Sequence, residues 1–159
     1  MFAHPSASAV EVAVNAYRGA FEYQGQKCSA VSRLYVPESL WPSIKKELLT
    51  ISNDVKMGDV TDPMNFVNAV IDEKSFDNIM NYITYAKNSH EAEIIAGGHG
   101  DKSTGYFIEP TIIVTTNPRF RTMEEEIFGP VLTVYIYQDE HVQQTLDLCN
   151  TTSPYGLTG

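Results

Sequence analysis

Val131-Leu132-Thr133-Val134-Tyr135-Ile136-Tyr137 has the clearest strand pattern in this chain of 159 residues. β-Branched and aromatic residues, which favour strands, fill the segment, and apolar side chains occupy both odd and even positions. A strand that is apolar on both faces is typical of the centre of a sheet that is covered by helices on both sides. We therefore expect residues 131–137 to form the central strand of the fold.

Further strands are expected where short apolar or β-branched runs end at turn-forming residues. They cover residues 32–36, 93–96, 106–108 and 111–115. Pro110 separates the last two runs and predicts an edge, a bulge or a change of direction there, because proline cannot donate a hydrogen bond to a sheet ladder. Residues 97–103 superficially resemble a phosphate loop, but Asp101 would repel a phosphate, so a hairpin-like turn is expected instead.

Amphipathic helices are expected between these strands, because apolar residues recur three and four positions apart. The expected helices cover residues 10–23, 38–53 and 75–88, with a last one that carries Val142, Leu146 and Cys149 on one side. On the first helix, capped by Ser6 or Ser8, the expected buried face consists of Val10, Val14, Tyr17 and Phe21. The third helix starts at Asp72 or Ser75. Strands that alternate with helices predict an α/β architecture with an open, largely parallel sheet and flanking helices.

The composition is that of a globular protein, with 43% hydrophobic and 19% charged residues. The formal net charge of -9 would repel phosphate backbones and anionic lipid, so neither nucleic acid nor a membrane is an expected partner. No apolar run is long enough to span a bilayer, and the first residues carry no signal pattern. We expect an intracellular protein. The four histidines are scattered without a second ligand at metal spacing, so no metal site is expected.

Cys28 lies beside Lys27 and small residues, where a helical pattern gives way to a strand pattern. The thiolate is the nucleophilic form of cysteine, and a neighbouring cation lowers the pKa of a thiol. Lys27 could act in this way if its side chain turns toward the thiol. Two interpretations stay open from the residues alone, a reactive nucleophile or a small buried hydrophobe. Cys149 lies on an apolar helical face and is expected to belong to the core.

Two segments carry a family resemblance. Gly25-Gln26-Lys27-Cys28-Ser29-Ala30 resembles the active-site cysteine segment of the aldehyde dehydrogenase superfamily, and Glu125-Glu126-Ile127-Phe128-Gly129-Pro130 resembles its second signature. Within the superfamily the chain is most similar to the 1-pyrroline-5-carboxylate dehydrogenase branch. That similarity is carried by residues 20–30, 68–74 and 153–159. The resemblance extends from about Pro5 to the last residue.

The resemblance implies an NAD-dependent oxidoreductase in which Cys28 attacks a small aldehyde and passes through a thioester. In this branch the aldehyde is glutamate semialdehyde, which is oxidised to glutamate in proline catabolism. By the same resemblance Ser29 helps to hold the substrate carboxylate, Glu126 binds the ribose of the nicotinamide half of NAD, and Phe128 packs beside the nicotinamide ring. From the residues alone, Ser29 is equally a turn serine. Glu126 would belong to a solvated acidic run with Glu124, and Phe128 would be an ordinary core residue.

The chain is short for such an enzyme, whose family carries a dinucleotide-binding domain before the cysteine. We therefore expect residues 1–159 to be a single partial catalytic domain, without the dinucleotide-binding domain, the C-terminal part, the general-base glutamate or the oxyanion asparagine. The full-length enzyme would bind NAD and form a homo-oligomer, in the cytoplasm if bacterial or the mitochondrial matrix if eukaryotic. The alternatives are an isolated folded fragment without activity, or part of an aldehyde dehydrogenase with a different aldehyde substrate.

Overall fold

Strand β6 (Val131–Tyr137) lies at the centre of a four-stranded sheet of order β1-β6-β5-β2 in the computed structural model, as the sequence predicts. The structure describes residues 1–154 and 156. β1 (Arg33–Pro37) and β5 (Thr111–Thr115) both run parallel to β6, and β2 (Ala92–Ala96) pairs antiparallel with β5 at one edge. The predicted α/β class with an open, largely parallel sheet is confirmed. Of the segment 153–159, residues 155 and 157–159 lie outside the described residues.

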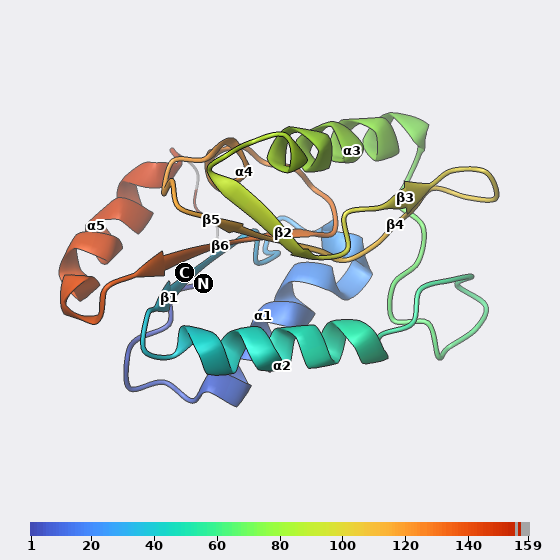
Figure 1. Ribbon diagram of the computed structural model, residues 1–159. Helices are drawn as coiled ribbons and strands as arrows, with labels where there is room; N and C mark the ends of the chain where they lie inside the picture. The colour runs from blue at the N-terminus through green and yellow to red at the C-terminus, as the bar shows by residue number, and fades with distance from the viewer. Residues whose placement is uncertain (155, 157–159) are drawn as a thin grey trace.

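Successive side chains of β6 point to opposite faces of the sheet, and each face packs into its own apolar cluster. Leu132 and Val134 join the cluster beneath helices α1 and α2, whereas Val131 and Tyr137 join the cluster beneath α3. All four side chains are buried. This two-sided burial explains why apolar residues occupy every position of β6 except Thr133, and Figure 1 shows the resulting three layers.

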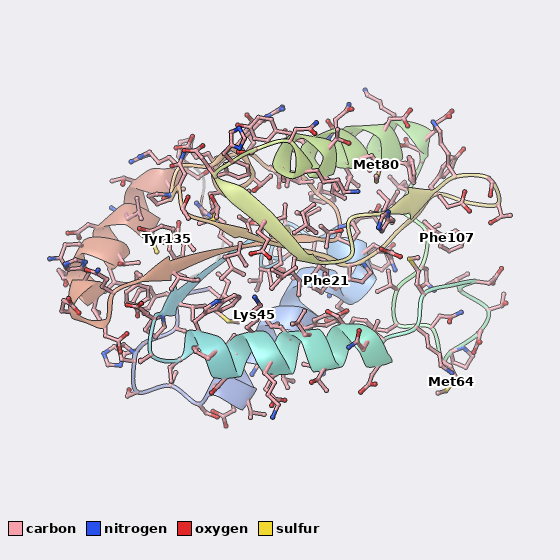
Figure 2. All side chains as sticks on the ribbon, in the orientation of Figure 1. Phe21, Lys45, Met64, Met80, Phe107 and Tyr135 are labelled. Atoms are coloured by element: carbon pink, nitrogen blue, oxygen red, sulfur yellow. The ribbon has the colours of Figure 1, made fainter. Side chains whose placement is uncertain are left out.

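Helices α1 (Ala9–Phe21) and α2 (Trp41–Asp54) cover one face of the sheet (Figure 1). Ser8 caps α1, and Phe21 lies between α2 and the sheet (Figure 2). The expected buried face of α1 is partly wrong, since Val10 is 54% and Val14 47% exposed. The buried residues of α1 are Ala13, Ala16, Tyr17, Ala20 and Phe21. Alanine has no side chain beyond Cβ, so an alanine-rich face lets the helix approach its neighbours closely.

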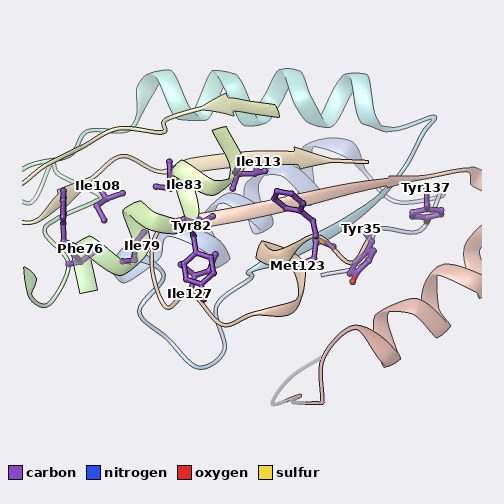
Figure 3. Close-up of a cluster of buried hydrophobic side chains, with 14 residues drawn as sticks. Tyr35, Phe76, Ile79, Tyr82, Ile83, Ile108, Ile113, Met123, Ile127 and Tyr137 are labelled. Atoms are coloured by element: carbon purple, nitrogen blue, oxygen red, sulfur yellow. The ribbon is translucent and has the colours of Figure 1, made fainter. Parts of the chain in front are cut away.

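Helix α3 (Glu73–Lys87), capped by Asp72, covers the other face, together with the short α4 (Arg121–Glu124) and α5 (Val142–Thr152). The side chains that fill this cluster are shown in Figure 3. Val142 and Cys149 pack against the cluster as expected. Leu146 is 40% exposed, so its expected place on the buried side of α5 is wrong.

A small second sheet pairs β3 (Gly100–Asp101) with β4 (Phe107–Ile108), and Figure 2 labels Phe107 on it. Pro110 separates β4 from β5, so the chain passes at this residue from the small sheet to the main sheet. The hairpin connection spans residues 102–106 rather than 97–103. Gly97 instead has a φ of 68°, and a Cβ there would lie 2.2 Å from the carbonyl oxygen of Pro110. Two 3₁₀ turns, η1 (Glu22–Gly25) and η2 (Asp139–His141), complete the described elements.

The first residues of the chain cover the outer edge of β1. Phe2 forms a parallel bridge with Tyr35, the Ala3 N–H donates to the Tyr35 carbonyl at 2.9 Å, and the Tyr35 N–H donates to the Met1 carbonyl at 3.0 Å. The Tyr137 hydroxyl donates to the Ala3 carbonyl at 2.5 Å, and its ring stacks on Phe2 at 5.3 Å between centroids. The sheet is therefore continued beyond β1 by residues 1–3.

Tyr137 should make the fold less stable at alkaline pH. Burial raises the pKa of Tyr137 to about 12, above the roughly 10 of a free tyrosine. A raised folded-state pKa favours the protonated fold, so this stabilisation is complete below about pH 10 and is lost as the pH rises toward about 12. Between about pH 9 and pH 12, we expect the unfolding free energy of the wild-type protein to fall by about 2 kcal/mol more than that of Tyr137→Phe. Urea unfolding of both proteins measures it, and an equal loss in both would contradict the assignment.

Candidate active site

Cys28 and Ser29 are the two central residues of a tight turn between η1 and β1. The Ala30 N–H donates to the Lys27 carbonyl at 3.1 Å and closes the turn, and the next N–H, of Val31, donates to the carbonyl of a helical residue at 2.9 Å. Both central side chains are exposed to solvent. The interpretation of Cys28 as a small buried hydrophobe is therefore wrong.

The three residues that end η1 have left-handed backbone conformations, with φ of 55° at Tyr23, 56° at Gln24 and 65° at Gly25. This conformation costs roughly 1–2 kcal/mol in a residue with a Cβ, so the surrounding structure has to maintain it. A Cβ on Gly25 would lie 2.2 Å from the carbonyl oxygen of Gly129. The two backbones are therefore in direct contact, and this contact joins the cysteine turn to residues 125–130.

Residues 125–130 form a second turn that sends neighbouring side chains in opposite directions. Ile127 is 6% exposed and belongs to the core, whereas Phe128 is 45% exposed. Phe128 also has a left-handed φ of 58°. The interpretation of Phe128 as a core residue is therefore wrong.

The three adjacent glutamates differ in their partners. Glu124 is half-buried and pairs with Arg119 at 3.0 Å, so it is not simply the solvated residue that we expected. Glu125 pairs with Arg121 at 3.0 Å and accepts a hydrogen bond from the Tyr82 hydroxyl. Within the described part of the chain, the Glu126 carboxylate has no hydrogen-bond or ion-pair partner, and it is exposed. Glu126 is thus the member of the run whose two oxygens can accept hydrogen bonds from a ligand.

The four candidate residues, Cys28, Ser29, Glu126 and Phe128, line one cleft of about 810 Å³. The topology explains this meeting. The cysteine turn precedes β1 and the glutamate turn precedes β6, and the amino ends of adjacent parallel strands lie at the same edge of a sheet. A nucleophile, a free carboxylate and an exposed aromatic ring therefore face a common space.

The cleft also contains residues that the sequence did not single out. Tyr82 reaches it from α3, and Arg33 reaches it from β1. Among the described residues, Nη1 of Arg33 is buried without a hydrogen-bond partner, so it can donate to an acceptor. Tyr82 lies beside the apolar stripe of a helix, and Arg33 is the first residue of an apolar strand. Residues at such positions usually have a structural role, so the sequence contains no signal that either one lines a site.

The Lys27 ammonium pairs with a carboxylate, whereas the sequence suggested that it could lower the pKa of the Cys28 thiol. Its ammonium lies 3.1 Å from the Glu22 carboxylate, and this contact lowers the pKa of Glu22. Lys27 is therefore paired with a carboxylate rather than held for the thiol of Cys28. Cys149 is half-buried on α5, and burial raises the pKa of its thiol.

Within residues 1–154 and 156, no three His, Cys, Asp or Glu side chains are grouped so that they could hold a metal ion. In the same part of the chain, no helix combines the length and the apolar character that crossing a membrane requires.

Known proteins resemble the chain over almost its whole length. The profile of the aldehyde dehydrogenase family matches residues 2–159. A mitochondrial delta-1-pyrroline-5-carboxylate dehydrogenase of Dictyostelium discoideum is 56% identical over 158 residues, which are 99% of this chain and 28% of the relative. The Danio rerio protein of the same name is 52% identical over 159 residues, 99% of this chain and 29% of the relative.

A solved structure shows the same fold. The delta-pyrroline-5-carboxylate dehydrogenase of Mycobacterium tuberculosis bound with NAD gives a TM-score of 0.91 at 40% identity, over 99% of this chain and 28% of that one. The chain thus spans less than a third of the length of these relatives.

A substitution at Gly25 tests the contact between the two turns. We expect Gly25→Ala to destabilise the fold by about 2–4 kcal/mol, because the new methyl group meets the Gly129 carbonyl and alanine disfavours a positive φ. Gly156→Ala is the control, since a Cβ there meets no atom of residues 1–154 within 4 Å. Chemical denaturation measures both variants. A loss of stability no larger than that of the control would show that the backbones can separate freely.

The two thiols should differ in reactivity. We expect iodoacetamide near neutral pH to label Cys28 at least about ten times faster than Cys149. Cys28 is exposed, whereas burial raises the pKa of the Cys149 thiol. Site-resolved mass spectrometry over time measures the two rates in the folded chain and in denaturant, where they should converge. Equal rates in the folded chain would contradict the exposure of the turn.

Proposed function

The chain belongs to the aldehyde dehydrogenase family, and we propose that it is the central part of the catalytic domain of an NAD-dependent 1-pyrroline-5-carboxylate dehydrogenase. Such an enzyme oxidises glutamate 5-semialdehyde, the open form of 1-pyrroline-5-carboxylate, to glutamate in proline catabolism. The observation that carries the proposal is the single cleft lined by Cys28, Ser29, Glu126 and Phe128. The names of the relatives support the substrate. The dinucleotide-binding domain and the C-terminal part would lie elsewhere in the full-length enzyme.

Cys28 would supply the nucleophile. Its sulfur adds to the aldehyde carbon, and the carbonyl oxygen becomes an oxyanion in a tetrahedral adduct. Within the described residues the backbone N–H of Cys28 has no acceptor, so it can donate to that oxyanion. Loss of hydride from the adduct leaves a thioester on the sulfur, and attack by water then breaks the carbon–sulfur bond to release the acid and the thiol.

NAD, when bound, would accept the hydride. The residues present fit the nicotinamide half of the cofactor. A carboxylate without other partners, as at Glu126, can accept two hydrogen bonds from the vicinal hydroxyls of a ribose, and the exposed ring of Phe128 offers an apolar surface to a flat ring. Loss of either group should therefore weaken cofactor binding more than aldehyde binding.

Ser29 adjoins Cys28 in the turn, and its exposed hydroxyl can donate to the carboxylate of glutamate semialdehyde. A small aldehyde is therefore the expected partner. We further propose a homo-oligomer, located in the mitochondrial matrix if the source is eukaryotic, as the name of the Dictyostelium discoideum relative suggests, and in the cytoplasm if it is bacterial.

The test uses the full-length enzyme that contains this chain. We expect glutamate semialdehyde to be oxidised with a kcat/KM at least about tenfold above that of short aliphatic aldehydes, because only the former has a carboxylate to bind. Cys28→Ala should abolish turnover while leaving NAD binding intact. Glu126→Gln should weaken NAD binding by about 10-fold, because the amide is a poorer acceptor for two hydroxyls. Steady-state kinetics and a binding titration measure these effects, and a preference for aliphatic aldehydes would refute the substrate.

A further inference from the structure

The Glu125 carboxylate is held by two donors that come from different elements. Arg121 of α4 donates from Nε to Oε1 at 3.0 Å, and the Tyr82 hydroxyl of α3 donates to Oε2 at 2.6 Å. The Arg121 guanidinium in turn lies over the Tyr82 ring at 4.5 Å and over the Tyr85 ring at 5.5 Å. Each of the four side chains, Tyr82, Tyr85, Arg121 and Glu125, therefore contacts at least one of the others.

The protonation states support this arrangement. The hydrogen bond from Arg121 and then that from Tyr82 lower the pKa of Glu125, so its carboxylate is charged at neutral pH. Burial and the neighbouring Glu125 raise the pKa of Tyr82, so its hydroxyl keeps the proton that it donates. Hydrogen bonds to a charged acceptor are the stronger kind. We name Tyr82, Arg121 and Glu125 the carboxylate clamp.

The carboxylate clamp lies directly beside the residues proposed to bind the cofactor. Glu125 precedes Glu126, and Ile127, the residue after Glu126, is buried in the same apolar cluster as Tyr82 (Figure 3). Gly129 then contacts Gly25. Among the described residues, Glu126 and Phe128 thus alternate with three residues, 125, 127 and 129, that have contacts of their own. The orientation of Glu126 and Phe128 depends on these neighbours.

We propose that Tyr82 and Arg121 are positioning residues, which act through Glu125 to orient Glu126 and Phe128 toward the nicotinamide half of the dinucleotide. This inference rests on the proposed function. Neither residue belongs to the two motifs that carry the family resemblance, and Tyr82 lies 43 positions before Glu125. The affinity for the cofactor would then depend on the Tyr82 hydroxyl, although this hydroxyl donates its hydrogen bond to Glu125 and not to the cofactor.

The chain offers a matched control. Arg119 and Glu124 form another arginine–glutamate ion pair, with Nη1 of Arg119 3.0 Å from Oε1 of Glu124, in the segment 119–125 that also contains Arg121 and Glu125. Arg119 also donates to Thr151 of α5, so this pair connects the segment to α5 instead of α3. Breaking it removes a comparable ion pair while leaving the carboxylate clamp intact.

The experiment measures NAD binding to the full-length enzyme by titration, together with the KM values for NAD and for the aldehyde. Tyr82→Phe removes the hydroxyl and keeps the ring, and it should weaken NAD binding by about 3- to 10-fold, the size of one hydrogen bond. The KM for the aldehyde at saturating NAD should stay within about twofold, and Arg119→Gln should leave NAD binding unchanged. Arg121→Lys, which keeps the charge but loses the planar fork, should weaken NAD binding in the same direction.

Unchanged NAD binding in Tyr82→Phe would overturn the proposal, as would an equal effect of Arg119→Gln or a parallel rise of both KM values. Glu125→Gln, which keeps the side-chain volume, serves as the second variant if Tyr82→Phe does not fold, and it should also weaken NAD binding. A wild-type enzyme that binds NAD but prefers another aldehyde would refute the proposed substrate alone, since the positioning is read from cofactor binding. A wild-type enzyme that does not bind NAD would refute both.

Discussion

The contact between Gly25 and Gly129 is the constraint on which the site depends. No side chain fits on Gly25 at this contact, because a Cβ there would lie 2.2 Å from the Gly129 carbonyl oxygen. A Cβ on Gly129 would instead lie 2.4 Å from the Ile79 side chain of α3. The contact fixes the distance between the turn before β1 and the turn before β6. Gln24 and Phe128, which flank the two glycines, have left-handed backbones that the surrounding structure has to maintain.

The parallel sheet supplies the frame for this contact. β1 and β6 are adjacent and parallel, with Leu34 opposite Val134, so the segments that precede them start from the same edge. Burial of β6 on both faces fixes its register, since a slip by one residue would exchange Leu132 and Thr133 between the two apolar clusters. The sheet thus carries two turns that each present exposed side chains at one edge, and rigid elements of this kind are suited to holding a binding site in a fixed geometry.

The sequence predicted the parts of this structure that follow from periodicity or from a local motif. β6 was identifiable because its residues are apolar at both odd and even positions. Cys28 and Glu126 became candidates because each belongs to a recognisable segment, and the fold places both at one cleft. Val10 and Val14 were misplaced because hydrophobicity favours valine over alanine, whereas close helix packing favours the smaller residue. Phe128 has a positive φ and an exposed side chain, and sequence periodicity reports neither. The bond from Tyr82 to Glu125 spans 43 positions and joins two elements whose relative placement only the tertiary fold determines.

The short segment that continues the sheet beyond β1 has a consequence for how copies of the chain behave together. An edge strand with free N–H and C=O groups is a template on which another chain can add a strand. Met1 and Ala3 occupy the backbone groups of Tyr35 on this side, and the Phe2 ring is stacked on Tyr137. Residues 1–3 therefore occupy the backbone groups of Tyr35 with which another chain could pair, and removing these residues would leave those groups free for such pairing.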